Sequence, residues 1–420
     1  MITNIIQQQR EERDILMKQP YLQRIADKQI SEYLSLKLIK LITGPRRAGK
    51  SVMALQLLRE QNFGYLNFDD DLLLKNFNEN AVIQSLNEVY PGHEFLLLDE
   101  IQNLPQWELW VNKLHRRGVN LIITGSNAKL LSHEMASSLT GRYIQIPVFP
   151  FSLKEVMRYH GLTDLTADFT DPRKTGTFIN LFNEYLINGG FPETVINPAI
   201  SKNYLSSLFD SVLLKDILRR YKIRQTQQLY DLANYLLANY ANSYTFNRLK
   251  EDMNFNSVAT VQKYISYLEE PWLMINLPRY HTKFKVQNNS PRKIFVIDNG
   301  FISSRSFELS PNYGRLLENL VFTVLLRRNY RPGLELFYYR TRNNKEIDFL
   351  CRKGHKVEQL IQVSYDITGK KTLNRENGAL YEAALELDCN DLLLITKETE
   401  GETEIKGKKI IIKPAYRWLK

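Results

Sequence analysis

Residues 44–51 read Gly-Pro-Arg-Arg-Ala-Gly-Lys-Ser, which fits the pattern G-x-x-x-x-G-K-[ST]. An apolar run that predicts a buried strand precedes this stretch and a helical pattern follows it, which is the setting of a phosphate-binding loop. Glycines in such a loop let backbone N–H groups face phosphate oxygens, and the start of the next helix adds positive potential. We therefore expect a nucleotide site formed by Gly44, Pro45, Arg46, Arg47, Ala48, Gly49, Lys50 and Ser51.

Four side chains predict chemistry on ATP and Mg²⁺. Lys50 would place a positive charge near the β- and γ-phosphates, and Ser51 would give an oxygen to Mg²⁺. A later apolar run ends in Asp99 and Glu100, and an acid at the carboxyl end of a parallel strand faces the ligand crevice. We expect Asp99 to hold Mg²⁺ through water and Glu100 to orient the water that attacks the γ-phosphate.

Further polar residues follow the next apolar run. Ser126 or Asn127 is predicted to sense the γ-phosphate, although both also suit an ordinary turn. Arg142 is either an arginine finger, acting in cis or across a subunit interface, or a surface arginine. An interface role would require a homo-oligomer, which the sequence leaves open. Arg46 and Arg47 either help to neutralise phosphate or face solvent.

Short apolar runs alternate with helical patterns between residues 37 and 130, which predicts an α/β fold of βαβ units. The continuous apolar character of these runs suits a parallel sheet that helices cover on both faces. The predicted strands span residues 38–42, 65–68, 95–98 and 121–124.

Composition sets the broad class of the protein. The 420 residues are 43% hydrophobic and 24% charged, which is typical of a soluble globular chain of about two to four domains. No run approaches 18 apolar residues, so no membrane span is expected. The two cysteines, Cys351 and Cys389, are too few for a disulfide framework or a cysteine-only zinc site, which favours the cytoplasm.

Pattern changes along the chain predict three domains. Residues 1–204 form the P-loop domain with a helical end, residues 205–280 a helical domain, and residues 281–420 a second α/β domain. The polar segment 281–292 is the expected boundary between the last two. The net charge of +10 is concentrated in residues 281–420, which hold 25 basic and 17 acidic residues. Such asymmetry indicates either a module that binds a polyanion or a lysine-rich solvated surface.

The chain resembles a family of bacterial and archaeal AAA-type ATPases with a C-terminal domain of the restriction-endonuclease-like class. The resemblance is carried by ITGPRRAGKS, LLLDEIQ, ITGSNAKLL, LTGRY and NGGFP, and it continues to YYRTRNNKEIDF. It implies an AAA-like ATPase core with a helical lid, a winged-helix middle and a nuclease-like end.

Residues 244–265 resemble two helices of a winged helix-turn-helix. Ser257 is predicted to cap the second helix, with Val261, Ile265 and Leu268 on its packed face. Thr260, Gln262 and Lys263 would then face outward, where a recognition helix contacts DNA. The surrounding acids leave residues 205–280 nearly neutral, so a structural connector is the alternative.

The C-terminal domain resembles the PD-(D/E)xK nucleases, whose acids hold Mg²⁺ and whose lysine assists the nucleophile. The matching positions are Glu318, Asp348, Gln362 and Ser364. Ser364 stands where the lysine is expected, and Gln362 is a neutral ligand, so we expect a nuclease fold without catalysis. Tyr338 and Tyr339, among basic residues, could stack on bases, but adjacent strand residues alternate and one should be buried.

Three functions are consistent with these features. The first is a cytoplasmic Mg²⁺/ATP-dependent ATPase that couples nucleotide state to nucleic-acid binding, with DNA contacted through residues 281–420. The second is a nucleotide-gated switch or scaffold that binds a protein partner without DNA. The third is an ATP-gated DNA nuclease.

Overall fold

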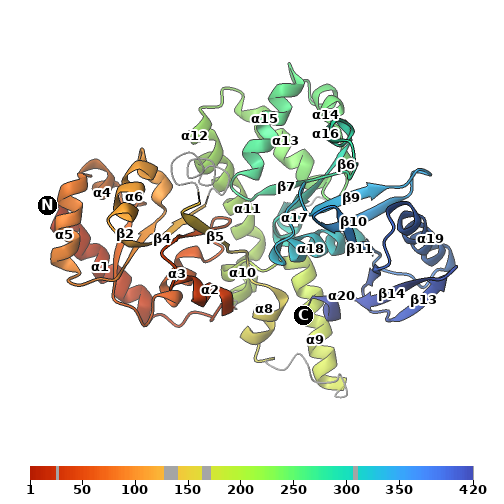
Figure 1. Ribbon diagram of the computed structural model, residues 1–420, viewed down its shortest axis with the longest axis horizontal. Helices are drawn as coiled ribbons and strands as arrows, with labels where there is room; N and C mark the ends of the chain where they lie inside the picture. Colours follow the sequence, from red (N-terminus) through yellow and green to blue (C-terminus); the bar gives the residue numbers. More distant parts are fainter. Residues whose placement is uncertain (25–27, 127–140, 163–171, 306–310, 420) are drawn as a thin grey trace. The chain divides into compact units, whose positions relative to one another are not determined.

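The computed structural model describes residues 1–24, 28–126, 141–162, 172–305 and 311–419. The chain separates into two compact units, each with its own sheets and core (Figure 1). Unit one consists of Met1–Pro150 and Glu270–Trp272, and unit two of Phe151–Glu269 and Leu273–Lys420.

Unit one is built on a parallel sheet with the strand order β2-β3-β4-β1-β5. The first four of these are almost wholly buried and apolar, as expected for a sheet that is covered on both faces. The predicted α/β fold with a parallel sheet is therefore confirmed. The strands are β1 (Ile39–Thr43), β2 (Phe63–Asn67), β3 (Phe95–Asp99), β4 (Asn120–Gly125) and β5 (Tyr143–Pro147).

Helices of unit one bury apolar stripes spaced three or four residues apart. In α6, Trp107, Trp110, Val111 and Leu114 are buried, and Trp110 packs edge to face on Phe77 with ring centroids 5.1 Å apart. The helices are α1 (Ile2–Lys18), α2 (Lys28–Tyr33), α3 (Lys50–Leu57), α4 (Asp71–Lys75), α5 (Glu79–Val89) and α6 (Trp107–Arg116).

The carboxyl ends of the parallel strands gather the predicted nucleotide residues at one edge of the sheet. Strand β1 runs into the Gly44–Gly49 loop, β3 ends at Asp99, and β4 leads into Ser126. Because β4 lies between β1 and β3, its last residues stand between the P-loop and the acids.

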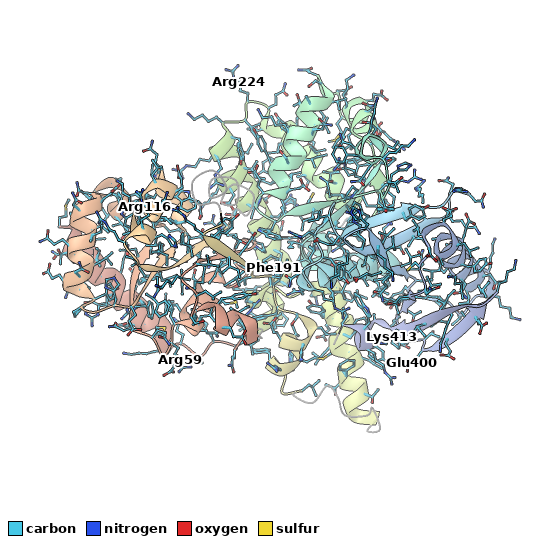
Figure 2. The ribbon with its side chains drawn as sticks, in the orientation of Figure 1. Arg59, Arg116, Phe191, Arg224, Glu400 and Lys413 are labelled. Atoms are coloured by element: carbon cyan, nitrogen blue, oxygen red, sulfur yellow. The ribbon has the colours of Figure 1, made fainter. Side chains whose placement is uncertain are left out.

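The first part of unit two is helical. A turn at Gly189-Gly190 is closed by the buried carboxylate of Asp298, which accepts from the N–H of Gly190 at 2.8 Å and of Gly300 at 2.9 Å. Figure 2 shows Phe191 inside this unit, where its ring packs on Phe301 with centroids 4.9 Å apart. The helices are α8 (Leu153–Tyr159), α9 (Pro172–Asn188), α10 (Pro192–Ile196), α11 (Ser201–Ser211), a π-helical stretch (Val212–Leu218), α12 (Arg219–Tyr221) and α17 (Asn299–Arg305).

Four further helices and a small antiparallel sheet form the middle part of unit two. The Oγ of Ser257 accepts from the N–H of Thr260 at 3.1 Å, so the predicted cap is present, and Val261, Ile265 and Leu268 are buried as expected. Gln262 and Lys263 are exposed. The elements are α13 (Thr226–Ala238), α14 (Phe246–Asp252), α15 (Val258–Glu269), β6 (Ser243–Tyr244), β7 (Met274–Pro278), α16 (Phe284–Asn289) and β8 (Arg292–Val296), with β8 between β6 and β7.

The C-terminal part of unit two is a mixed sheet with the order β13-β14-β12-β11-β10-β9 (Figure 1). Its strands β11, β12 and β14 are parallel to one another, and the other neighbouring pairs are antiparallel. The elements are α18 (Tyr313–Arg327), β9 (Leu336–Arg340), β10 (Glu346–Lys353), β11 (Lys356–Val363), α19 (Lys370–Leu387), β12 (Leu392–Thr396), β13 (Gly401–Ile405), β14 (Lys408–Pro414) and α20 (Ala415–Trp418).

The compact units divide the chain after Pro150 and do not separate the three predicted domains, whose boundaries stay predictions. The segment 281–292, expected to be a boundary, connects the antiparallel neighbours β7 and β8 and contains α16. Among the described helices, none is both long and apolar enough to cross a membrane.

Candidate functional site

In the loop between β1 and α3, two glycines adopt backbone conformations that other residues rarely adopt. Gly44 has a φ of 156°, and a Cβ added there would lie 1.9 Å from the carbonyl oxygen of Val148. Gly49 has a φ of 90° and directly precedes α3, a conformation that side chains with a Cβ rarely adopt. The loop therefore winds closely past the end of β5 and directs the start of α3 towards the sheet edge.

Lys50 is buried at the start of α3. Its Nζ donates to the carbonyl oxygen of Pro45 at 3.2 Å and lies 3.5 Å from Oε1 of Glu100. The Lys50 ammonium would have to give up these two contacts, with a loop carbonyl and with a carboxylate, in order to bind a phosphate. The structure thus brings together the predicted phosphate lysine and the predicted base.

Asp99 is the centre of a hydrogen-bond network at the same edge. It accepts from the Oγ of Ser51 at 2.8 Å, from the hydroxyl of Tyr65 at 3.2 Å, and from the Oγ1 of Thr124. Burial raises the pKa of Asp99 and the Glu100 carboxylate raises it further, against the hydrogen bonds from Thr124 and Ser51. Positive charge at this carboxylate would therefore be stabilising.

Glu100 leaves the sheet in a left-handed conformation with a φ of 51°. Its backbone N–H donates to the Oγ1 of Thr124 at 3.0 Å, and one carboxylate oxygen accepts from the amide of Gln102. Burial alone would raise the pKa of Glu100, but the Lys50 ammonium, the Gln102 amide and Arg46 hold it below its ordinary value. Glu100 is therefore an ionised carboxylate at neutral pH, as a proton acceptor must be.

The remaining predicted site residues are placed differently from one another. Ser126 is buried directly after β4, level with the P-loop, whereas Asn127 lies outside the described residues. Arg142 precedes β5 at the opposite edge of the sheet, where its guanidinium donates to Asn112 at 2.9 Å. In this arrangement Arg142 does not reach the nucleotide residues of its own chain. Arg46 lies near Glu100, and Arg47 is exposed with a φ of 65°.

Three residues of the site were not predicted from the sequence. Thr124 joins the side chain of Asp99 to the backbone of Glu100, and Tyr65 reaches Asp99 from the edge strand β2. Arg24 is buried, and its guanidinium donates to the carbonyl oxygens of Ala48 at 3.2 Å and Phe149 at 2.6 Å. Thr124 and Tyr65 both lie in apolar runs that predict strands, whereas no sequence pattern marks Arg24.

The donor set at Ser51 and Asp99 fits Mg²⁺. A hydroxyl and a carboxylate oxygen, 2.8 Å apart, are hard oxygen ligands of the kind that Mg²⁺ takes beside nucleotide phosphates. The raised pKa of Asp99 has burial as its first cause, and a bound cation would offset that cost.

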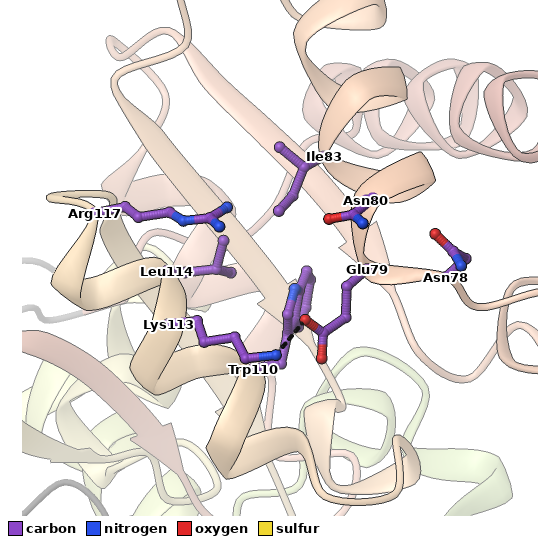
Figure 3. A pocket seen from close by; sticks show the side chains of 8 residues that line it. All are labelled: Asn78, Glu79, Asn80, Ile83, Trp110, Lys113, Leu114 and Arg117. Carbon is purple, nitrogen blue, oxygen red and sulfur yellow. Dashed lines mark hydrogen bonds and ion pairs between the residues drawn. The ribbon is translucent and has the colours of Figure 1, made fainter.

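A separate hollow of about 400 Å³ lies between α5 and α6 (Figure 3). Lys113 on α6 pairs with Glu79 on α5 at 2.7 Å across it. None of its lining residues belongs to the P-loop or the acid pair: they are Asn78, Glu79, Asn80, Ile83, Trp110, Lys113, Leu114 and Arg117. It is therefore not the nucleotide site.

The predicted nuclease positions also come together in unit two. Glu318 on α18, Asp348 on β10 and Gln362 on β11 are neighbours, and the Oε1 of Gln362 accepts from the N–H of Asp348 at 3.3 Å. Ser364 bonds instead to the carbonyl oxygen of Asp366 at 3.2 Å. An unpredicted lysine, Lys293 on β8, lies among the acids, 2.7 Å from Glu318 and 3.2 Å from Asp348.

Many basic residues of the C-terminal sheet already have acidic partners. Arg340 pairs with Glu346 at 2.9 Å and Lys345 with Glu382 at 3.0 Å. Tyr338 is fully buried, as expected for one member of the adjacent pair. The hydroxyl of Tyr339 donates to Glu386. Exposed basic side chains remain at the turn between β10 and β11, at Lys353 and Lys356.

Comparisons with known proteins assign three regions. Residues 37–157 match the AAA domain family, and residues 179–308 and 313–416 match two domains of unknown function, DUF8612 and DUF4143. The uncharacterized protein MJ1544 of Methanocaldococcus jannaschii is 32% identical over 417 residues, 93% of this chain and 91% of its own. An uncharacterized protein of Haemophilus influenzae is 30% identical over 415 residues, 94% of this chain and 97% of its own.

Solved structures show weaker similarity. The Walker-type ATPase PABY2304 of Pyrococcus abyssi has a TM-score of 0.44 and 16% identity, covering 69% of this chain and 99% of its own. Cdc6p of Pyrobaculum aerophilum has a TM-score of 0.28 and 14% identity, covering 76% and 99%.

Proposed function

Because the chain belongs to the same family as the Methanocaldococcus jannaschii and Haemophilus influenzae proteins and is a P-loop ATPase of the AAA type, we propose that it couples Mg²⁺-dependent ATP hydrolysis to nucleic-acid binding. The observation that carries the ATPase half is the network in which Ser51, Asp99 and Thr124 lie beside the Lys50–Glu100 pair.

Each residue of the network has a role in this proposal. The Lys50 ammonium exchanges its contacts with Glu100 and Pro45 for contacts with the β- and γ-phosphates. The loop N–H groups bind the same phosphates. Ser51 and Asp99 would hold Mg²⁺, which would supply positive charge against the phosphates. Glu100 then orients the attacking water and accepts its proton. Ser126 is the proposed contact to the γ-phosphate, and Arg142 could serve only a neighbouring subunit.

ATP turnover and nucleotide binding by three variants test this half. Lys50→Ala should abolish nucleotide binding, since it removes the buried cation. Glu100→Gln should bind ATP normally and hydrolyse it about 10²-fold or more slowly, as expected when a general base is lost. Glu94→Gln is the matched control, because Glu94 is exposed at the opposite end of the same strand. Normal hydrolysis by Glu100→Gln would show that another group orients the water.

The nucleic-acid half of the proposal rests on residues 281–420. This segment carries 25 basic and 17 acidic residues, and Lys353 and Lys356 are exposed together at the β10–β11 turn, where they face each other in register. Clustered exposed lysines release counterions from a phosphate backbone, which gives affinity without sequence specificity.

A second function, a nucleotide-gated switch that binds a protein, is favoured by a different observation. Arg340 and Lys345 are engaged by Glu346 and Glu382, so these two basic side chains already have partners within the domain. A protein partner would not need that charge.

Binding of the full chain to duplex and single-stranded DNA over a salt series distinguishes the two. For the nucleic-acid function we expect ATP turnover to rise with DNA, and Lys353→Glu/Lys356→Glu to lower the slope of log affinity against log salt by about two. Lys345→Glu is the control, because its charge is already paired. DNA-indifferent turnover together with no salt-dependent retention would favour the protein-binding switch.

A further inference from the structure

Lys293 is a buried cation in the middle of the predicted nuclease residues. It lies on β8, is 2% exposed, and its strand alternation puts it on the same face as Phe295. The ring of Phe295 stacks on Phe322 of α18 with centroids 4.1 Å apart and lies 5.6 Å from Phe349 of β10. This aromatic packing fixes the face of β8 that carries Lys293 against α18 and β10.

Three carboxylates surround the ammonium. Nζ of Lys293 lies 2.7 Å from Glu318 on α18, 2.7 Å from Glu346 and 3.2 Å from Asp348, both on β10. Burial would lower the pKa of Lys293, but the three carboxylates together raise it well above its ordinary value. Lys293 therefore carries a positive charge, whereas burial raises the pKa of Glu318 to about 8 and also raises the pKa of Asp348, against the opposing effect of the Lys293 ammonium.

Protein donors engage both oxygens of Asp348, both oxygens of Glu346 and the amide oxygen of Gln362. Oδ2 of Asp348 accepts from the N–H of Val363 at 2.9 Å, and its Oδ1 faces Lys293. The second oxygen of Glu346 accepts from Arg340 at 2.9 Å. The Oε1 of Gln362 accepts from the Asp348 N–H. Within the described residues, no group of three or more His, Cys, Asp or Glu side chains has the geometry of a metal site.

We propose that the Lys293 ammonium is the resident cation of this cluster and takes the place of a divalent metal ion. The ion pairs of the three acids with Lys293 then hold β8 against α18 and β10. As a consequence, the domain binds no Mg²⁺ at this cluster and does not cleave DNA. A metal ion in the cluster would meet a buried ammonium that is already bonded to each acid, and one of the two cations would have to leave.

Manganese binding in the absence of nucleotide, followed by electron paramagnetic resonance, tests the proposal. The wild type and Asp348→Asn should bind the same number of Mn²⁺ ions, because Asp348 is engaged by Lys293. Lys293→Met should gain one ion, since it leaves three buried carboxylates without their cation, and Lys293→Met/Asp348→Asn should lose that ion again. Lys345→Met is the matched control, because it removes an exposed lysine from an ion pair of the same domain.

Thermal unfolding gives a second readout. Loss of one partner from a buried ionic cluster is expected to lower the melting temperature of Lys293→Met by about 10 °C, and Mn²⁺ should restore part of the loss. A Mn²⁺ ion bound by the wild type and lost in Asp348→Asn would overturn the proposal. So would a folded Lys293→Met that gains no ion, or plasmid cleavage by the wild type that Lys293→Met abolishes. If Lys293→Met does not fold, the comparison of wild type with Asp348→Asn decides.

Discussion

Replacing Thr124 with valine tests whether the site depends on the strand that separates the P-loop from the acids. The Thr124 hydroxyl donates to Asp99 and accepts from the backbone N–H of Glu100 at 3.0 Å. Valine has the same shape, and Thr124 is fully buried, so water cannot replace the lost hydroxyl. The substitution therefore leaves the Glu100 N–H without its acceptor and the Asp99 carboxylate without one donor.

The size of the effect follows from these two bonds. A hydrogen bond to a charged group contributes about 1.5–3 kcal/mol, and each 1.36 kcal/mol in the barrier changes the rate about tenfold. We expect Thr124→Val to lower kcat for ATP hydrolysis by about 10- to 100-fold, because Glu100 loses its position. Affinity for ATP should change less than about threefold, since Lys50 and the loop remain in place.

Steady-state ATP turnover and nucleotide titration measure both quantities, and Thr43→Val is the matched control. Thr43 is also a fully buried threonine, at the end of the adjacent strand β1, and its hydroxyl accepts from the amide of Gln145 at 2.9 Å instead of joining the two acids. Its loss should lower the free energy of unfolding by about 1 kcal/mol and leave kcat unchanged. If Thr124→Val hydrolyses ATP as fast as Thr43→Val, the bridge between Asp99 and Glu100 does not position the catalytic carboxylate.

Three further predictions concern backbone, pH and capping. Gly44→Ala should introduce about 1–3 kcal/mol of strain, because the new Cβ would clash with the carbonyl oxygen of Val148. Nucleotide binding should weaken about tenfold or more, and unchanged affinity in an equilibrium titration would contradict this. Burial raises the pKa of Asp298 to about 6. The folded state therefore binds the proton more tightly than the unfolded one, and the wild type should lose about 2 kcal/mol of unfolding free energy relative to Asp298→Asn as the pH rises from 4 to 6 in urea denaturation. A difference that does not change with pH would refute this. Ser257→Ala should cost about 1 kcal/mol of unfolding free energy through its bond to Thr260, and no change in the denaturation midpoint would argue against the cap.

The strands of the parallel sheet could be predicted because burial on both faces leaves a continuous apolar run. The exception is β5, Tyr143–Pro147, which is partly exposed and includes Gln145. The other edge strand, β2, is almost wholly buried and keeps its apolar run, whereas the partial exposure of β5 removes the continuous apolar pattern that identified the other four strands.

The nucleotide site could be predicted only where its residues are contiguous. The loop 44–51 and the pair Asp99-Glu100 form local patterns, and the structure places both at one sheet edge. Thr124 and Tyr65 join the site through strand order and register, which no local pattern encodes. Arg24 reaches Ala48 from a segment with no regular structure of its own.

Lys293 shows why the number of basic residues in 281–420 overstates the number of basic side chains that a partner meets. This lysine is one of the 25 basic residues, yet it lies in the interior among three carboxylates. Arg340 and Lys345 likewise form ion pairs with acids of the same domain. The potential outside a protein depends on charge that is exposed and not locally compensated, so exposed lysines such as Lys353 and Lys356 at the β10–β11 turn should contribute to the attraction for a polyanion. The numbers of basic and acidic residues in the sequence give the sign of that potential. Only the fold shows where on the surface the potential lies.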